Sequence, residues 1–270
     1  MSGRRRSSRP LVPLTLVVAI SAVCALVDRE SPGRLHPSLA WSAPSLARPL
    51  GCGEAGVDLL AVLAHAELRA LLLATTVALA GWLVGLPLGG AAALARGRAE
   101  RLAERACDLV QAFPTFILAL AVLSAVREPS RTAIGAVFAI TAWAPFARLS
   151  LAQTRTLRDS SFVEAAIALG RSPAAVLVRH IIPNLLSVAA VQLGSSAAAM
   201  VVSEAALAFL GFGPRDGVSL GGILDQGVAS MFLAPHVLVT GAASVFATSA
   251  ALMAAGRWFE RELPDGATAR

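Results

Sequence analysis

The sequence predicts an all-α integral membrane protein with six transmembrane helices. Of its 270 residues 56% are hydrophobic, the mean hydropathy is +0.69, and only 15% are charged. A soluble domain carries closer to a quarter charged residues. The charges also cluster, so that long stretches contain none. These observations place the chain in the membrane class.

Six charge-free runs predict the individual spans. Five of them have the roughly 17 to 25 residues that a helix needs to cross a hydrocarbon core. The run at 132–147 is shorter, so its helix is expected to extend into the flanking loops. The six runs are 10–27, 70–95, 109–126, 132–147, 181–203 and 237–256. The first run also has the arginine-rich start of a secretory signal peptide, which is an alternative interpretation of it.

Small residues within two runs predict close helix packing. In the second run these are Gly81, Gly85, Gly89 and Gly90, with Pro87 as a source of a kink. In the fifth run they are the small residues at 194–199. Those residues could instead line a pathway, and we favour close packing.

The distribution of arginine predicts the orientation. All 23 basic residues are arginine, and 16 of them fall on one side if the N-terminus is cytoplasmic. This matches the positive-inside tendency. The predicted organisation is a cytoplasmic tail at 1–9, the first helix at 10–27, an extracytoplasmic loop at 28–69, a five-helix core at 70–256 and a cytoplasmic tail at 257–270. Both termini are therefore expected to be cytoplasmic.

The internal segment at 148–183 has a detailed local pattern. Ser161 and Glu164 have the spacing of a helix-capping box. Phe162, Ala165, Ala166 and Leu169 would then lie on one helical face. Gly170 is placed to end that helix in a left-handed conformation. A second helix is expected to begin at Ser172 and Pro173, as N-cap and first residue.

Two functions suit such a hairpin on the cytoplasmic side. Its small-residue apolar face could dock into a cleft on a soluble partner, or it could rest on lipid headgroups. Pro183 and Asn184 mark a kink or restart where the chain returns to the membrane. The local pattern by itself does not choose between docking and lipid contact.

The same segment resembles the EAA loop of bacterial ABC importer permeases. Glu164, Ala165 and Ala166 are followed by Gly170 and then by His180-Ile-Ile-Pro183, where the general pattern has I-x-L-P. The chain is most similar to the second permease subunit of the dipeptide, oligopeptide and nickel importers. Further matching segments occur in the order of that family, and they are 48–58, 108–114, 143–148 and 204–211. The resemblance at the C-terminal end is loose.

The resemblance implies a type I importer permease fold and a role in transport. Two permease subunits would form the pathway in the bacterial inner membrane, two ATPase subunits would drive it, and an extracytoplasmic binding protein would deliver peptides or nickel. The ATP and Mg²⁺ would be bound by the ATPase subunits. The loop at 148–183 would dock on an ATPase, with the coupling residues Ser161, Glu164, Ala165, Ala166, Gly170, His180 and Pro183. The substrate-contacting residues remain unassigned.

Other function classes fit less well. A P-loop requires lysine, and the chain has none, so ATP hydrolysis is expected in a separate subunit. The four histidines and three cysteines lack metal-ligand spacing, and no nucleophile motif accompanies them, so neither catalysis nor a metal site is expected. The arginines punctuate apolar runs and do not indicate nucleic acid. The main alternative is an ion-coupled transporter or channel, for which Glu204 is the one intramembrane acid; it could also lie at the interface or in a folded-back segment.

Overall fold

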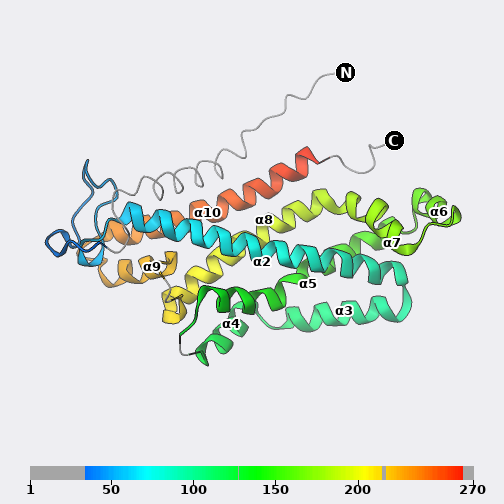
Figure 1. The fold of residues 1–270 in the computed structure, drawn as a ribbon, viewed down its shortest axis with the longest axis horizontal. Helices are drawn as coiled ribbons and strands as arrows, with labels where there is room; N and C mark the ends of the chain where they lie inside the picture. Colours follow the sequence, from blue (N-terminus) through cyan, green and yellow to red (C-terminus); the bar gives the residue numbers. More distant parts are fainter. Residues whose placement is uncertain (1–33, 127, 215–216, 264–270) are drawn as a thin grey trace, which may run out of the picture.

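The structure is a computed structural model that describes residues 34–126, 128–214 and 217–263. The predicted tail at 1–9 and first span at 10–27 lie outside the described residues. The described parts are helical apart from turns, loops and a single bridge between Cys52 and Asp58. They form an elongated bundle whose long helices run along the longest axis of the molecule (Figure 1).

Four long helices form the body of this bundle. They are α2 (Leu59–Ala95), α5 (Arg131–Leu157), α8 (Ile182–Leu207) and α10 (Pro235–Glu262). α2 lies at the centre and packs against α5 and α8, and α10 packs against α8. The hydrophobic core includes Ala74 and Val201, both fully buried.

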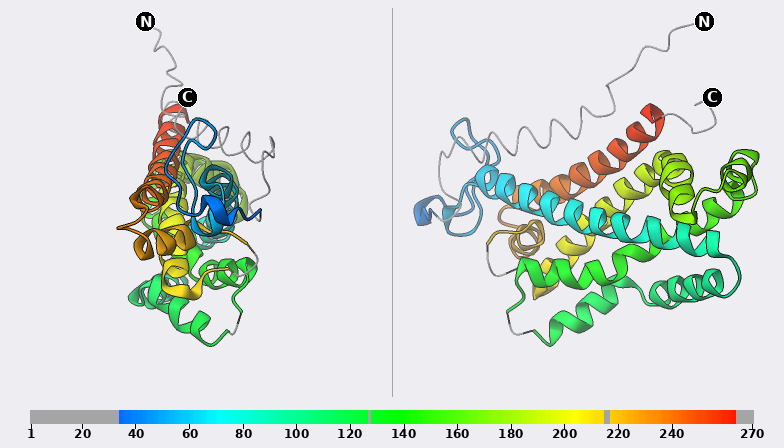
Figure 2. Two further views of the ribbon diagram at one scale, coloured as in Figure 1. Left: turned by 90° about the vertical axis from the view of Figure 1, so that its left-hand side faces the viewer. Right: turned by 45° about the vertical axis from the view of Figure 1, so that its right-hand side comes forward.

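Shorter elements occupy the ends and one side of the bundle. At the α6 end lie α6 (Ser161–Ala168) and α7 (Pro173–Val176). At the opposite end, the α9 end, lie residues 34–58 and α9 (Leu220–Ala229) (Figure 1). α3 (Gly97–Ala112) and α4 (Thr115–Ser124) run beside α5, as the second view in Figure 2 shows. Two π-helical turns, Leu177–Ile181 and Ala208–Phe212, flank α8.

Four helices in the described ranges are long and apolar enough to cross a membrane, or five if α3 and α4 count as one broken span. The predicted runs at 70–95, 132–147, 181–203 and 237–256 each lie within one of the four. The predicted total of six spans is not confirmed. The chain is thus a multi-pass helical protein by length and composition.

The predicted span at 109–126 is wrong as a single helix. α3 and α4 meet at a break where the axis bends by 64°. The cause is Pro114, which is the N-cap of α4, because the residue before a proline is driven out of the helical region. Phe113 accordingly has an extended backbone, with φ −93° and ψ 124°.

Helix ends also depart from the predicted loop boundaries. α2 begins at Leu59, inside the predicted loop at 28–69, because the Asp58 carboxylate caps it by accepting from the Leu60 amide at 2.8 Å. α5 extends as expected, and it continues to Leu157, well into the segment predicted as a loop at 148–183. α10 continues to Glu262, past the predicted start of the tail at 257. Charged residues mark where a helix leaves lipid, and they do not end the helix.

The expected close packing of glycines is confirmed. A Cβ at Gly81, Gly85 or Gly89 would overlap a backbone carbonyl of α5. These glycines repeat every four residues, so they form one face of α2 along which the two backbones meet. Gly194 of α8 and Gly256 of α10 make a second such contact: a Cβ at Gly194 would lie 2.6 Å from the Leu252 carbonyl oxygen.

Candidate functional site

The hairpin of α6 and α7 ends its first helix as the sequence predicts. Gly170 has φ +77°, and its amide donates to the Ile167 carbonyl at 2.9 Å. The Arg171 amide donates to the Ala166 carbonyl at 3.1 Å. This pair of bonds is a Schellman motif, which requires a left-handed residue at the position of Gly170.

The helix starts differ in how well they were predicted. The Ser172 hydroxyl accepts from the Ala175 amide at 3.3 Å and Pro173 is the first residue of α7, as expected. The capping box at Ser161 is wrong: the N-cap of α6 is Ser160, and Ser161 is its first helical residue. The Ser160 hydroxyl instead donates to the Leu157 carbonyl at 2.5 Å, within the turn that follows α5. It therefore makes no side-chain cap for α6.

One face of α6 packs on the body of the protein. Val163 and Ala166 are buried in a cluster with four residues that follow them in α7, the first π-helical turn and α8. Leu94 at the end of α2 and Leu157 at the end of α5 pack against this cluster. The hairpin is therefore held by a small core of its own at the α6 end of the bundle.

The other face of α6 is exposed and largely apolar. Leu169 is 84% exposed, Ile167 56% and Phe162 36%, and Glu164 and Ala165 are exposed beside them. The predicted face is therefore only partly right, since Ala166 points into the core. Gly170 has no atom within 4 Å of where a Cβ would stand, so the turn is open as well.

His180 and Pro183 lie beyond the hairpin. His180 is in the π-helical turn, and its ring centroid is 6.4 Å from that of Phe162 in α6. Its carbonyl accepts from the Asn184 side chain at 2.5 Å. Pro183 is exposed in the first turn of α8. The structure thus brings His180 against the hairpin, and it leaves Pro183 on the following helix.

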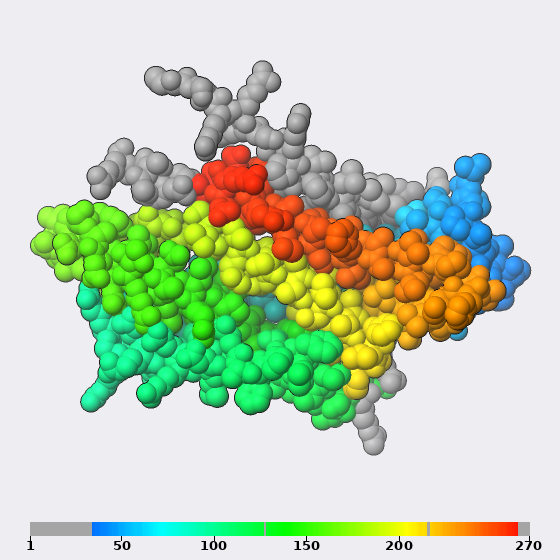
Figure 3. All heavy atoms as spheres, turned by 180° about the vertical axis from the view of Figure 1, so that it is seen from behind, coloured from blue at the N-terminus to red at the C-terminus, as the bar shows by residue number. Residues whose placement is uncertain are grey.

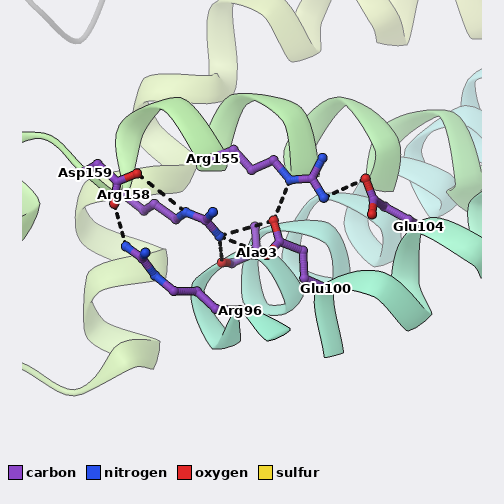
Figure 4. Close-up of polar contacts among 7 residues, drawn as sticks. All are labelled: Ala93, Arg96, Glu100, Glu104, Arg155, Arg158 and Asp159. Carbon is purple, nitrogen blue, oxygen red and sulfur yellow. Dashed lines mark hydrogen bonds and ion pairs between the residues drawn. The ribbon is translucent and has the colours of Figure 1, made fainter. Parts of the chain in front are cut away.

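A cluster of charges joins the foot of the hairpin to α2 and α3 (Figure 4). Glu100 of α3 lies at its centre, with its side chain 11% exposed. The Arg155 and Arg158 guanidinium groups of α5 both donate to this carboxylate, Arg158 at 3.1 and 3.2 Å. Arg155 also pairs with Glu104 at 2.6 Å.

The same cluster caps the C-terminal end of α2. Arg158 donates to the Ala93 carbonyl at 2.7 Å, which is one of the last carbonyls of that helix and has no helical partner. Arg96, in the turn between α2 and α3, pairs with Asp159 at 2.5 Å. Asp159 is two residues before α6, so these contacts fix the point from which the hairpin departs.

This cluster was not predicted from the sequence, where these arginines indicated only the orientation. The spacing of the charges could have indicated it. Arg96, Glu100 and Glu104 repeat every four residues, which places them on one face of a helix. Arg155 and Arg158 are three residues apart, which places them together on another helix. That α3 and α5 bring the two faces together follows only from the fold.

Glu204 is buried inside α8 and is only 1% exposed. α8 is continuous through Glu204, and the first non-helical residue after it is Gly211 with φ +86°, so the expected folded-back position of Glu204 is wrong. Its expected position at the membrane interface stays a prediction. Neither of its carboxylate oxygens has a hydrogen-bond partner among the described residues.

Comparisons with known proteins agree with this architecture. Residues 85–263 match the family described as "Binding-protein-dependent transport system inner membrane component", and the chain belongs to that family. The matched range includes the hairpin, the charge cluster and the helices from the second half of α2 onward. The earlier resemblance to ABC importer permeases is confirmed, and the chain is a membrane component of such a transport system.

Several relatives are named "Glutathione transport system permease protein GsiD". The protein of that name from Pectobacterium atrosepticum is 30% identical over 206 residues, which are 76% of this chain and 68% of that protein. Those from Escherichia coli O1:K1 and Shigella dysenteriae serotype 1 are 36% and 37% identical over 150 residues. In these two matches the aligned part spans about half of the relative, 49% of its length.

Proposed function

We propose that this chain is one of two permease subunits of an ATP-driven importer. A second permease completes the pathway, two ATPase subunits supply the energy, and an extracytoplasmic binding protein delivers the solute. The observation that carries the proposal is the exposed apolar face of α6, held rigidly where the ends of α2, α3 and α5 meet. The face has no partner among the described residues and suits docking into a cleft on a soluble protein.

The orientation follows from the charges around that face. The α6 end contains Arg96, Arg155, Arg158 and Arg171, and positive charge marks the cytoplasmic side. The hairpin therefore faces the compartment that contains ATP. The N- and C-termini are cytoplasmic on the same argument.

Within the hairpin the residues divide by position. Glu164, Ala165 and Gly170 contact the ATPase, with Leu169 and Ile167 supplying apolar area. Ala166 supports them from inside. Ser161 lies in the first turn, and His180 and Pro183 transmit displacement of the hairpin to α8 through the π-helical turn, since such turns are local irregularities often found at functional sites.

The cargo is a peptide. The name of these relatives specifies glutathione for those proteins, and the sequence resemblance is to importers of dipeptides and oligopeptides. Nickel rests on the sequence resemblance alone. The binding protein is expected to set the choice among peptides.

Crosslinking from the hairpin tests the docking. Leu169→Cys and Ala165→Cys, each carrying a maleimide photocrosslinker, are expected to give a product containing a P-loop protein, identified by mass spectrometry. Ala166→Cys is the matched control, because that side chain is 6% exposed and faces the core. The parent chain measures background from its own cysteines. Products with lipid alone, or labelling of Leu169→Cys from outside the cell, would contradict the proposal.

The main alternative from the sequence, an ion-coupled transporter, has the buried Glu204 in its favour but does not fit the family to which the chain belongs. Intramembrane acids often belong to proton relays. The two candidates differ in energy source. Uptake by an ATP-driven importer is expected to persist in the presence of an uncoupler while ATP is maintained, and to stop when ATP is depleted. The reverse pattern would support the ion-coupled reading.

A further inference from the structure

A recess opens on the side of the bundle formed by α4, α5 and α8. Its volume is about 160 Å³, and Val77 and Ala78, near the middle of α2, lie among its walls. Figure 3 shows a hollow on this face between α8 in yellow and the green segments. The recess thus lies halfway along the helices that cross the membrane.

Hydroxyl groups from three helices line this recess. Ser196 and Ser203 come from α8 and, being seven residues apart, share one face of it. Thr141 comes from α5 and Thr115 from the start of α4. The remaining lining residues are apolar, and none of the lining residues is charged.

Two of these hydroxyls have already used their hydrogen. Thr141 donates to the Phe138 carbonyl at 3.2 Å, and Ser203 donates to the Ala199 carbonyl at 2.8 Å. A hydroxyl has one hydrogen and two lone pairs. Both groups therefore offer only acceptor lone pairs to anything in the recess, which suits a ligand with N–H donors.

The opposite side of α2 and α8 is different. A larger cavity of about 390 Å³ lies there against α10, and its lining is almost wholly apolar. Its lining contains one hydroxyl, that of Thr75, whereas the recess has four. That side suits lipid chains. The free lone pairs of the hydroxyls in the recess can accept hydrogen bonds from water or a polar solute, but not from lipid chains. The recess therefore suits contact with water or solute.

We propose that the recess is this chain's half of the solute pathway and that it binds amide N–H groups of a peptide backbone through Thr141 and Ser203. The inference rests on the proposed function, and it adds the residues that contact the cargo. The second permease covers the open side. Uncharged acceptors bind backbone amides without regard to side chains, so this site accepts many peptides and leaves selection to the binding protein.

Labelling of introduced cysteines tests the recess without knowledge of the exact cargo. Ser203→Cys and Ser196→Cys are expected to react with a charged, membrane-impermeant methanethiosulfonate in intact cells that contain the whole transporter. The reaction should be at least about tenfold faster than at Leu83→Cys, because thiolate forms in water and not in lipid. Leu83 is the control since it lies on α2 and is 62% exposed. Equal rates at both sites would overturn the pathway assignment.

A protection experiment tests the ligand class. A casein hydrolysate, as a mixture of peptides, is expected to slow labelling of Ser196→Cys, which leaves Thr141 and Ser203 intact, and an equal concentration of glucose is not. Labelling that the hydrolysate does not slow would overturn the assignment to peptide amides. The energy source is measured separately, so fast labelling with ATP-independent uptake would reject the importer proposal and leave the recess as an aqueous site.

Discussion

Gly170→Asp is expected to leave the protein inserted in the membrane while ATP-driven uptake falls by more than about tenfold, the effect of losing a central docking contact worth about 2 kcal/mol. Gly170 lies in the left-handed region at φ +77° with open space around it. A side chain there meets no clash and costs the chain only about 1 kcal/mol in conformation. The carboxylate, however, would be desolvated in the interface with the ATPase. Uptake and ATP hydrolysis by the reconstituted complex measure the coupling.

Two variants separate docking from backbone strain. Gly97→Asp places the same side chain at φ +61°, also with open space, at the first residue of α3. Gly170→Asn retains a residue that tolerates the left-handed conformation and carries no charge. We expect both to stay close to the parent in coupling. If Gly97→Asp uncouples transport as strongly as Gly170→Asp, the hairpin loses its special role.

Glu100→Gln is expected to lower the free energy of unfolding by roughly 1 to 3 kcal/mol, because hydrogen bonds from two arginines to a carboxylate become bonds to a neutral amide oxygen. Arg155 and Arg158 would both lose the negative charge that they share at Glu100, whose side chain is 11% exposed, and Arg155 would keep its pair with Glu104. The midpoint of thermal unfolding in detergent, followed by tryptophan fluorescence, measures the change. Because the pairs are partly shielded from solvent, the loss should persist at high salt.

A second ion pair between the same two helices provides the control. Asp108 of α3 pairs with Arg148 of α5, and these side chains are 65% and 50% exposed. Exposed pairs contribute little, about 0 to 1 kcal/mol. Asp108→Asn should therefore shift the midpoint much less than Glu100→Gln. Equal shifts in the two variants would mean that the cluster in Figure 4 does not fix the foot of the hairpin.

Features that depend on a few neighbouring residues could be predicted from the sequence. The left-handed turn at Gly170 and the N-cap at Ser172 follow from local backbone chemistry, and both are confirmed. The order of apolar runs predicted four of the long helices. The family could be predicted from the spacing of Glu164, Ala165, Ala166 and Gly170, since motif spacing is a property of the chain alone.

Helix ends could not be predicted equally well, because a charged residue does not by itself terminate a helix. Arginine marks where a helix leaves lipid, yet α5 continues through Arg148 and Arg155 to Leu157. The N-cap of α6 was predicted at Ser161 and is Ser160, because the position where α5 ends determines where the next turn begins. The break at Pro114 was visible as a proline, but its 64° bend places α4 beside the recess only in the folded chain.

The sequence by itself determined that this chain crosses a membrane, where its glycines permit close packing, and which loop carries the EAA pattern. These depend on hydropathy and on residues within one or two turns of each other. Only the tertiary structure decided that Ala166 faces inward, that Glu100 pairs with two arginines from another helix, and that Thr141 and Ser203 line the same recess. Each of these joins residues more than fifty positions apart or depends on which face packs, and helix faces are assigned only when the bundle forms.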